Sequence, residues 1–224
     1  MPSVAIIGAS RGIGFGLAEY YAKNQWEVIA TQRNPDDGRA KNGNPNRASL
    51  EALGNNVRVA PLDVRDEAAL SRLADSVTAL DLLIHNAGVH DRDHSPDEVM
   101  AINAKAPFRV VDRLMPALRR GEQKKLLLMT SQLGARRGRR APLGVYGESK
   151  AQLNDEFRIR EPAWRSHGII AVVMHPGWVR TDMGGPSAPV SIEQSVGGIT
   201  RVLESLSAAD AGRFVTWEGR DHPW

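Results

Sequence analysis

The chain has 224 residues with 29 basic and 26 acidic side chains, a mild balance that does not by itself point to nucleic acid. Because the sequence contains no cysteine, it excludes disulfides, thiolate metal sites and a cysteine nucleophile. Its first residues lack a signal-peptide pattern and no apolar run approaches the length of a membrane span, so we expect a soluble cytoplasmic protein with no membrane partner.

A short, mostly β-branched run at residues 4–7 predicts the first buried strand. It is followed by a glycine-rich segment, GASRGIG at residues 8–14, and then by apolar residues at helical spacing. Strand, glycine turn and helix in this order are typical of a dinucleotide-binding βαβ unit, in which the glycines let the backbone approach the pyrophosphate at the helix N-terminus. A plain turn is the alternative, but the position directly after the first strand favours a cofactor site.

The end of the second predicted strand, residues 28–31, bears on the choice of cofactor. An acid at this point would accept a hydrogen bond from the adenosine 2′-hydroxyl of NAD and repel a 2′-phosphate. The sequence instead has Thr31, Gln32 and Arg33, while Arg11 lies in the glycine-rich segment. Two guanidinium groups can bind a 2′-phosphate bidentately, so we predict NADP (NADPH) rather than NAD. The alternative for Arg33 is an ordinary solvated loop arginine.

Alternating strand and helix patterns continue to the end of the sequence. Further strands are predicted at residues 57–62, 81–85, 126–129, 169–174 and 213–217. Helices are predicted at residues 67–77, 96–118 and 146–165, the last limited by Pro162, and after the N-cap Ser191. Polar loops are predicted at residues 35–45 and 134–144. This alternation predicts one α/β Rossmann domain over residues 1–224, a doubly wound parallel sheet of about seven strands with helices on both faces.

Polar residues follow two of these strands. Asp63 and Val64 come after the third strand, where a carboxylate would be able to accept a hydrogen bond from an adenine amino group. Asn86, Ala87 and Gly88 come after the fourth strand. A plain turn is one interpretation of this tripeptide, but it closes a strand at the same edge of the sheet as the glycine-rich segment.

Two features near residue 100 have interpretations that involve no functional role. The segment HDRDH at residues 90–94 superficially resembles a set of metal ligands, but its arginine and loop setting favour solvated charge, and we predict no metal site. Asn103 lies within the predicted helix at residues 96–118, where an asparagine is usually indifferent or marks a kink.

Tyr146 and Lys150 are four residues apart on a predicted helix and therefore share one face. A phenol is a poor proton donor at neutral pH, and an ammonium group beside it favours the phenolate and is expected to lower its pKa. This pair suits proton transfer to or from a carbonyl or alcohol oxygen. Ser131, which follows the fifth strand, is the nearest candidate to assist it.

These segments, in this order, resemble the short-chain dehydrogenase/reductase family over essentially the whole chain. The matching positions are Gly8, Gly12, Gly14, Asp63-Val64, Asn86-Ala87-Gly88, Asn103, Ser131, Tyr146, Lys150, Pro176-Gly177 and Thr181. The Thr-Asp-Met after the Pro-Gly turn and the Pro-Trp ending are similar to small carbonyl-reductase and C-factor-like members. Two positions depart from the family: Ile7 replaces a threonine and His85 an asparagine, which questions local hydrogen bonding more than chemistry.

The resemblance implies a role for each matching residue. Tyr146 would protonate the carbonyl oxygen, Lys150 would lower the pKa of Tyr146 and hold the nicotinamide ribose, and Ser131 would hydrogen-bond the substrate oxygen. Asn103 would hold a water that relays protons to Lys150. The implied cofactor-binding residues are Gly8, Ser10, Arg11, Gly12, Ile13, Gly14, Arg33, Asp63, Val64, Asn86, Ala87, Gly88, Tyr146, Lys150, Pro176, Gly177, Val179 and Thr181.

The sequence therefore predicts an NADP-dependent oxidoreductase acting on a carbonyl/alcohol pair. The alternative is a dinucleotide-binding regulatory or signalling protein with the same fold and little turnover. A nucleic-acid-binding module has little support, because a stacking aromatic face is lacking. The resemblance implies a homodimer or homotetramer packed through the helices that carry Asn103 and Tyr146.

The loop between Ser131 and Tyr146 carries four arginines. They are Arg136, Arg137, Arg139 and Arg140. Because the two flanking residues are the proposed catalytic groups, these guanidinium groups would lie near the substrate and would be able to attract anionic substrates. The alternative is a solvated loop, or one that pairs with acids of a neighbouring subunit.

Overall fold

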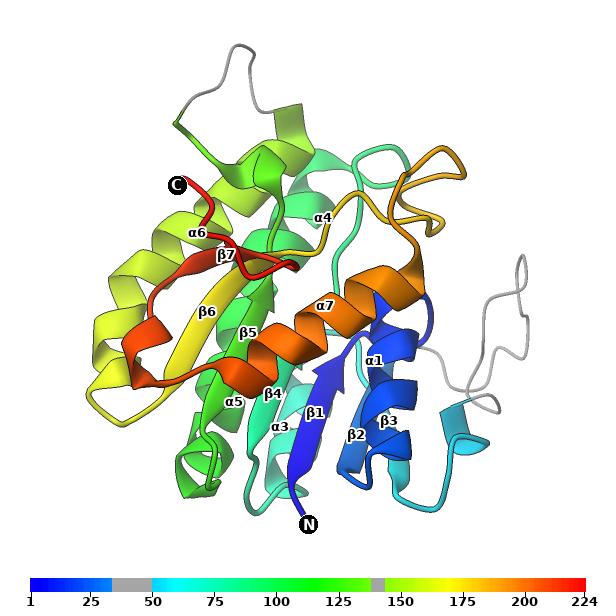
Figure 1. The fold of residues 1–224 in the computed structure, drawn as a ribbon, viewed down its shortest axis with the longest axis vertical. Coiled ribbons are helices and arrows are strands. Elements are labelled where there is room, and N and C mark those ends of the chain that lie inside the picture. Colours follow the sequence, from blue (N-terminus) through cyan, green and yellow to red (C-terminus); the bar gives the residue numbers. More distant parts are fainter. Residues whose placement is uncertain (34–49, 138–143) are drawn as a thin grey trace.

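The computed structural model describes residues 1–33, 50–137 and 144–224 of the chain. Within these residues, seven strands form one sheet in the order β3-β2-β1-β4-β5-β6-β7, and every neighbouring pair is parallel (Figure 1). The strands are β1 (Ser3–Ile7), β2 (Glu27–Gln32), β3 (Val57–Pro61), β4 (Leu82–His85), β5 (Lys125–Met129), β6 (Ile170–His175) and β7 (Phe214–Thr216). The predicted α/β Rossmann fold is confirmed.

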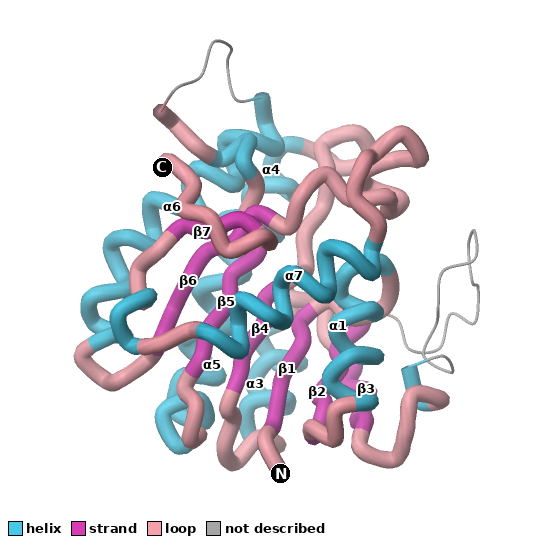
Figure 2. The backbone as a smooth tube through the Cα atoms, in the orientation of Figure 1, coloured by secondary structure: helices cyan, strands magenta, loops and turns pink. Residues whose placement is uncertain are grey.

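Two layers of helices cover the sheet (Figure 2). The helices are α1 (Gly12–Lys23), α3 (Glu67–Asp75), α4 (Pro96–Met100), a π-helix η2 (Ala101–Lys105), α5 (Ala106–Arg120), α6 (Gly144–Arg165) and α7 (Ile192–Ser205), with short 3₁₀ turns η3 (Gln132–Gly134) and η4 (Ala208–Asp210). Helices α1 and α7 pack on one face, and α3, α5 and α6 on the other.

Side chains along each strand alternate between these two layers. In β1, Ala5 and Ile7 belong to the core beneath α3, α5 and α6, whereas Val4 and Ile6 belong to the core beneath α1 and α7. Both faces of the sheet are therefore buried. This explains why the strands read as nearly continuous apolar runs rather than as alternating polar and apolar residues.

The strand order reverses between β1 and β4. From β1 the chain builds outward through β2 and β3, then returns to place β4 on the other side of β1. Ile7 is in register with His85, so both strands end at the same edge. In open parallel sheets, ligands bind at such a switch point, outside the carboxyl ends of the strands. The sheet thus brings the segments after Ile7 and His85 together where a cofactor site is expected.

Two helices differ from their predicted form. The helix predicted at residues 96–118 runs from 96 to 120 in three parts, with the π-helix Ala101–Lys105 in its middle. The predicted end of α6 at Arg165 is confirmed, but the helix remains regular through Pro162, which does not limit it as expected. Trp164 packs against Phe157 and Phe108, which holds the last turn in place despite the hydrogen bond that a proline cannot donate.

The predicted polar loop at residues 35–45 lies outside the described residues, as do residues 138–143 of the loop before α6. None of the helices in the described ranges combines the length and the apolar character that crossing a membrane requires.

Candidate active site

The glycine-rich segment and the segment after β4 pack directly against each other at the switch point. The Asn86 side-chain amide donates to the carbonyl of Gly8 at 2.7 Å. A Cβ atom on Gly8, whose φ is +85°, would lie 2.8 Å from Cα of Ala87, and one on Gly14 would lie 2.0 Å from the carbonyl oxygen of Gly8. No side chain fits at either glycine, so both residues are needed for the backbone to turn this tightly.

The amino end of α1 differs from those of α3, α4 and α7. Asp66, Ser95 and Ser191 each cap the helix that follows with a side-chain hydrogen bond, and the predicted cap at Ser191 is thereby confirmed. The N-cap of α1 is Arg11, which makes no capping bond, and the first turn holds no acid. The first N–H groups of α1 therefore lack side-chain partners and are oriented to bind an anion such as a pyrophosphate.

The end of β2 supplies uncharged and basic groups. The Thr31 hydroxyl accepts from the N–H of Gly8 at 3.0 Å. Gln32 is 5% exposed, and its side-chain nitrogen has no hydrogen-bond partner among the described residues. Arg33 is exposed beside it, and Arg11 forms an ion pair of 3.0 Å with Asp182. An unpaired buried donor with an exposed arginine next to it in the chain is able to hydrogen-bond the polar adenosine end of a dinucleotide.

Asp63, expected to accept from an adenine amino group, already has a partner. The Arg65 guanidinium donates to both of its carboxylate oxygens, at 3.0 and 2.8 Å, and these bonds lower the pKa of Asp63. Val64, the next residue, is buried in the core beneath α3. Asp63 therefore lies at the predicted sheet edge with its carboxylate held by a neighbour.

Lys150 and Asn103 form the buried centre of the site. Lys150 is 4% exposed, donates to the carbonyl of Met129 at 2.9 Å, and has its pKa lowered by burial to about 8. Asn103 is fully buried. Its amide exchanges hydrogen bonds of 2.9 and 2.8 Å with the backbone of Val89 and donates to the Ser149 hydroxyl at 3.0 Å.

Gly88 separates these two groups. A Cβ atom on Gly88 would lie 3.2 Å from the side-chain oxygen of Asn103 and 3.5 Å from Nζ of Lys150. The asparagine and the lysine thus face one small space in front of Gly88. Asn103 reaches it from the π-helix η2, a distortion of the kind often found at functional sites. The sequence allows for a kink at Asn103 but does not predict the extra residue of this π turn.

Tyr146 lies in the first turn of α6 and keeps part of its ring exposed. The surrounding protein raises the pKa of Tyr146 to about 12, and a hydrogen bond with Ser131 opposes this shift. Nζ of Lys150 is 6.0 Å from the ring centroid. The expectation that Lys150 lowers the pKa of Tyr146 is thus not met in the protein chain by itself, because burial of the phenol raises this pKa and the opposing contribution comes from Ser131.

Ser131 lies next to Tyr146. It is buried, its hydroxyl accepts from the N–H of Leu133 at 3.1 Å, and it hydrogen-bonds Tyr146. The 3₁₀ turn η3 that follows packs closely on α6: a Cβ on Gly134 would lie 2.8 Å from the backbone of Lys150. This contact fixes the distance between Ser131 and the face of α6 that carries Tyr146 and Lys150.

A histidine that the sequence did not assign to the site contacts the tyrosine. The ring of His90 is stacked on that of Tyr146, with centroids 4.9 Å apart and planes 11° from parallel. Nδ1 of His90 lies 2.6 Å from the carboxylate of Asp91, and His94 lies 3.9 Å from Glu98. Among the described residues, no group of three or more His, Cys, Asp or Glu is arranged to hold a metal ion.

The segment after β6 closes the site from the side of α1. The Ser195 hydroxyl donates to the carbonyl of Pro176 at 2.7 Å, and a Cβ on Gly177, whose φ is +91°, would lie 2.9 Å from Nε1 of the Trp217 indole. Val179 is buried, and the Thr181 methyl group would touch a Cβ on Gly12 at 3.2 Å. Thr181 therefore lies against the glycine-rich segment, while Pro176 and Gly177 pack against Ser195 and Trp217.

The two departures at the central strands have different outcomes. Ile7 is fully buried among apolar residues. His85 is 1% exposed, and its Nε2 has no hydrogen-bond partner among the described residues. Burial, reinforced by the charge of Lys150, lowers the pKa of His85 to about 3. The expected loss of local hydrogen bonding is thus found at His85.

The arginines of the loop before Tyr146 do not form a free basic rim in the described part. Arg136 pairs with Glu148 at 2.9 Å and Asp155 at 2.8 Å, both on α6 of the same chain. The Arg137 backbone N–H donates to the carbonyl of Trp224. Arg139 and Arg140 lie outside the described residues. The guanidinium of Arg136 is therefore neutralised within its own chain, which removes it from the proposed attraction of anions.

Comparisons with known proteins identify the family to which the chain belongs. The family model described as short chain dehydrogenase matches residues 2–189. The chain therefore belongs to the short-chain dehydrogenase family and is an oxidoreductase of that family. Its fold is similar to that of an NADPH-bound carbonyl reductase from chicken fatty liver, with a TM-score of 0.87 and 32% identity over 100% of this chain and 99% of that one.

Two further relatives are informative. A carbonyl reductase from Pseudomonas aeruginosa PAO1 in complex with NADP has a TM-score of 0.80 and 31% identity, with full coverage of both chains. C-signal from Myxococcus xanthus is 36% identical over 154 residues, which span 65% of this chain and 93% of that protein. The structural likeness supports a nicotinamide cofactor.

Proposed function

We propose that this protein is an NADP-dependent carbonyl reductase in which Tyr146 is the proton donor. The observation that carries the proposal is the convergence of Tyr146, Ser131, Lys150 and Asn103 at the switch point, next to the uncapped amino end of α1. A nicotinamide cofactor, when bound, would be the source of the hydride for the carbonyl carbon. The phenol of Tyr146 gives its proton to the carbonyl oxygen, to which Ser131 donates a hydrogen bond.

Lys150 and Asn103 support this proton transfer. An ammonium group about 6.0 Å from the Tyr146 ring stabilises the phenolate left after the proton is donated. Because Lys150 and Asn103 face the same space in front of Gly88, they are placed to hold a water that returns a proton to the tyrosine. The raised pKa of Tyr146 keeps the phenol protonated at neutral pH, which suits the reductive direction.

The preference for NADP rests on the residues at the end of β2. Gln32 and Arg33 provide no acid that would repel a 2′-phosphate, and Arg11 lies at the N-cap of α1. For Arg11 to bind the phosphate, it must release Asp182. The carbonyl reductases from chicken fatty liver and Pseudomonas aeruginosa, named for bound NADPH and NADP, support this choice.

The proposal is tested by the loss of NADPH absorbance with a panel of aldehydes, ketones and quinones. We expect Tyr146→Phe to bind NADPH as well as the natural protein and to lose turnover by roughly 10²–10⁴-fold, the scale of general acid catalysis. Tyr20→Phe is the matched control, because the Tyr20 hydroxyl contacts Glu204 away from the site. A Tyr146→Phe variant with full turnover would contradict the proposed mechanism.

A second candidate is a regulatory or signalling protein that binds the dinucleotide but turns over little. The similarity to C-signal over 154 residues favours keeping it. The same measurements separate the two functions: a signalling protein would bind NADPH with ordinary affinity and show no turnover on any carbonyl of the panel.

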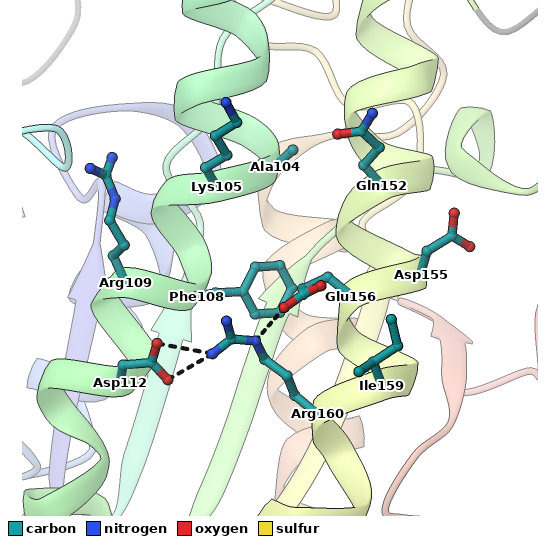
Figure 3. A pocket seen from close by; sticks show the side chains of 10 residues that line it. All are labelled: Ala104, Lys105, Phe108, Arg109, Asp112, Gln152, Asp155, Glu156, Ile159 and Arg160. Carbon is teal, nitrogen blue, oxygen red and sulfur yellow. Dashed lines mark hydrogen bonds and ion pairs between the residues drawn. The ribbon is translucent and has the colours of Figure 1, made fainter.

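We also infer that two copies of the chain pair through α5 and α6. A surface hollow between these helices is lined by apolar and oppositely charged side chains (Figure 3). Ile159, which lines the hollow, is 73% exposed, and Arg160 pairs with Asp112 across the hollow and with Glu156 one turn earlier on α6. A mixed-charge surface of this kind can complement itself across a two-fold axis. Light scattering should report a dimer that Ile159→Arg dissociates, and a monomeric natural protein would overturn the inference.

A further inference from the structure

The segment after β4 places an imidazole directly on the tyrosine of the site. His90 is two residues beyond Gly88, and its ring lies face to face with that of Tyr146 at a centroid distance of 4.9 Å. Both rings are partly exposed, so one face of Tyr146 is covered by His90 while the site remains open to a substrate. Histidine and tyrosine come from separate elements, and their contact joins the β4 side of the site to α6.

Asp91 holds the two rings together. One of its oxygens lies 2.6 Å from Nδ1 of His90, and the other accepts from the backbone N–H of Tyr146 at 3.4 Å. Two lone pairs at 2.6 Å would repel, so Nδ1 carries a hydrogen and donates it to Asp91. The backbone N–H of Arg92 also approaches Nδ1, but at a longer distance of 3.3 Å. The shorter contact with Asp91 therefore determines the tautomer of His90. Nε2 is left as the free nitrogen of the ring.

The same carboxylate also stabilises the start of α6. The first turn of this helix contains no acid of its own, and its N–H groups carry the positive end of the helix dipole. Asp91 supplies the negative charge from another segment. One side chain thus fixes the backbone at Tyr146, the tautomer of His90 and the plane in which the imidazole lies.

We propose that His90 and Asp91 are positioning residues that hold the ring of Tyr146 in its reactive orientation; the proposal rests on the function proposed above. Turning the phenol ring about its own axis leaves the oxygen in place but changes the plane in which the O–H bond prefers to lie, whereas rotation about the Cα–Cβ bond moves the oxygen itself. A ring stacked on one face of Tyr146 restricts both rotations and excludes water from that face. Misplacing a reacting group by about 1 Å can lower turnover by roughly 10²-fold.

The test distinguishes the stacking of a flat ring on Tyr146 from the hydrogen bonding of the imidazole nitrogens. We expect His90→Ala to lower kcat roughly 10–100-fold with the KM for NADPH unchanged, because the cofactor contacts lie elsewhere. His90→Phe keeps a flat ring and should recover most of the lost kcat. Asp91→Asn, which weakens the anchor of the imidazole, should fall between these variants and the natural protein. His94→Ala is the control on the same segment, since His94 is near Glu98 rather than Tyr146.

A second measurement does not depend on turnover. With ring ¹³C-labelled tyrosine, the chain gives signals from only 3 tyrosines, and Tyr146→Phe identifies the one that belongs to the site. His90→Ala should shift that signal and speed the ring flips of Tyr146, while His90→Phe should restore both. A tyrosine signal insensitive to His90→Ala, or a Phe variant no better than the Ala variant in either measurement, would overturn the positioning role. Absence of turnover in the natural protein would instead contradict the proposed function and leave the ring measurement decisive.

Discussion

Two parts of the site are held by different kinds of contact. Lys150 and Asn103 bond to backbone groups at 2.8–2.9 Å, Asn103 also donates to the Ser149 hydroxyl at 3.0 Å, and these residues are almost fully enclosed. At the rim, exposed arginines hold the neighbouring segments: Arg11 pairs with Asp182, Arg92 donates to the carbonyl of Met183, and Arg136 pairs with acids of α6.

The difference shows that the contacts in the two parts of the site differ in strength and in their sensitivity to salt. Buried hydrogen bonds are costly to leave unmade and are hardly affected by salt. Exposed ion pairs contribute about 0.2–1 kcal/mol each and are screened. The groups proposed for chemistry are thus fixed by the first kind of contact. The segment at residues 181–184, which borders the site, is held by the second kind and can be released at little cost.

Breaking the buried part should have the largest effect. Asn103→Ala leaves the N–H and carbonyl of Val89 unpaired, so we expect the free energy of unfolding to fall by about 1–3 kcal/mol for each group left unsatisfied. Turnover should fall roughly tenfold or more. The control is Asn56→Ala, because Asn56 also bonds two backbone carbonyls, of Ala22 and Trp26, but far from the site. Urea unfolding and NADPH turnover give both quantities. Equal losses of turnover in the two variants would refute a specific role for Asn103.

Changing the end of β2 should have the next largest effect. In the double variant Gln32→Asp, Arg33→Ala, a new acid accepts from the adenosine ribose and repels the 2′-phosphate. We expect the preference for NADPH over NADH to drop by roughly 10–100-fold, the equivalent of one or two charge-assisted hydrogen bonds. Arg58→Ala serves as the control, since the Arg58 side chain on β3 donates to the hydroxyl of Ser76, the residue directly after α3. Side-by-side titrations in which the natural protein prefers NADH would contradict the assignment.

Replacing the buried His85 should have a smaller effect, which appears in how the free energy of unfolding depends on pH. The pKa of His85 is lowered from 6.5 to about 3, so between these values the unfolded chain binds a proton that the folded chain excludes. The stability associated with neutral His85 is therefore full above pH 6.5 and declines as the pH falls toward 3. His85→Asn should flatten this part of the curve of unfolding free energy against pH by on the order of a few kcal/mol. Parallel curves for the two proteins would show that His85 is not responsible.

Replacing an arginine at the exposed rim should have the smallest effect on stability. Arg136→Gln removes exposed ion pairs to Glu148 and Asp155, so we expect a loss of at most about 1 kcal/mol that disappears in high salt. Because this guanidinium is already paired, the variant should not change the ratio of rates for a carboxylate-bearing substrate and its neutral ester. A ratio that falls in the variant and in high salt would restore the idea that this loop attracts anions.

The sequence predicted the parts of this molecule that local pattern determines. Apolar runs ending in Gly8, Asn86 and Ser131 placed the strands and the edge at which they end, because the carboxyl ends of parallel strands must meet. It did not predict the stacking of His90 on Tyr146, since 56 positions separate them in the chain and the contact depends on how the β4 segment turns. The raised pKa of Tyr146 was also missed, because desolvation depends on the packed surroundings and not on spacing.

The π-helix at Ala101–Lys105 also limits how this gene product can change in length. A π turn equals an α-helix with one extra residue, and each residue of an α-helix advances by about 100°. Deleting one residue inside α5 would swing its buried side chains, Val110 and Leu114 among them, off the sheet by that angle. The same deletion within the π turn would leave both flanking helices in phase and lose only the bulge that presents Asn103. The core can thus tolerate the loss of one residue within the π turn, but that loss removes part of the proposed site.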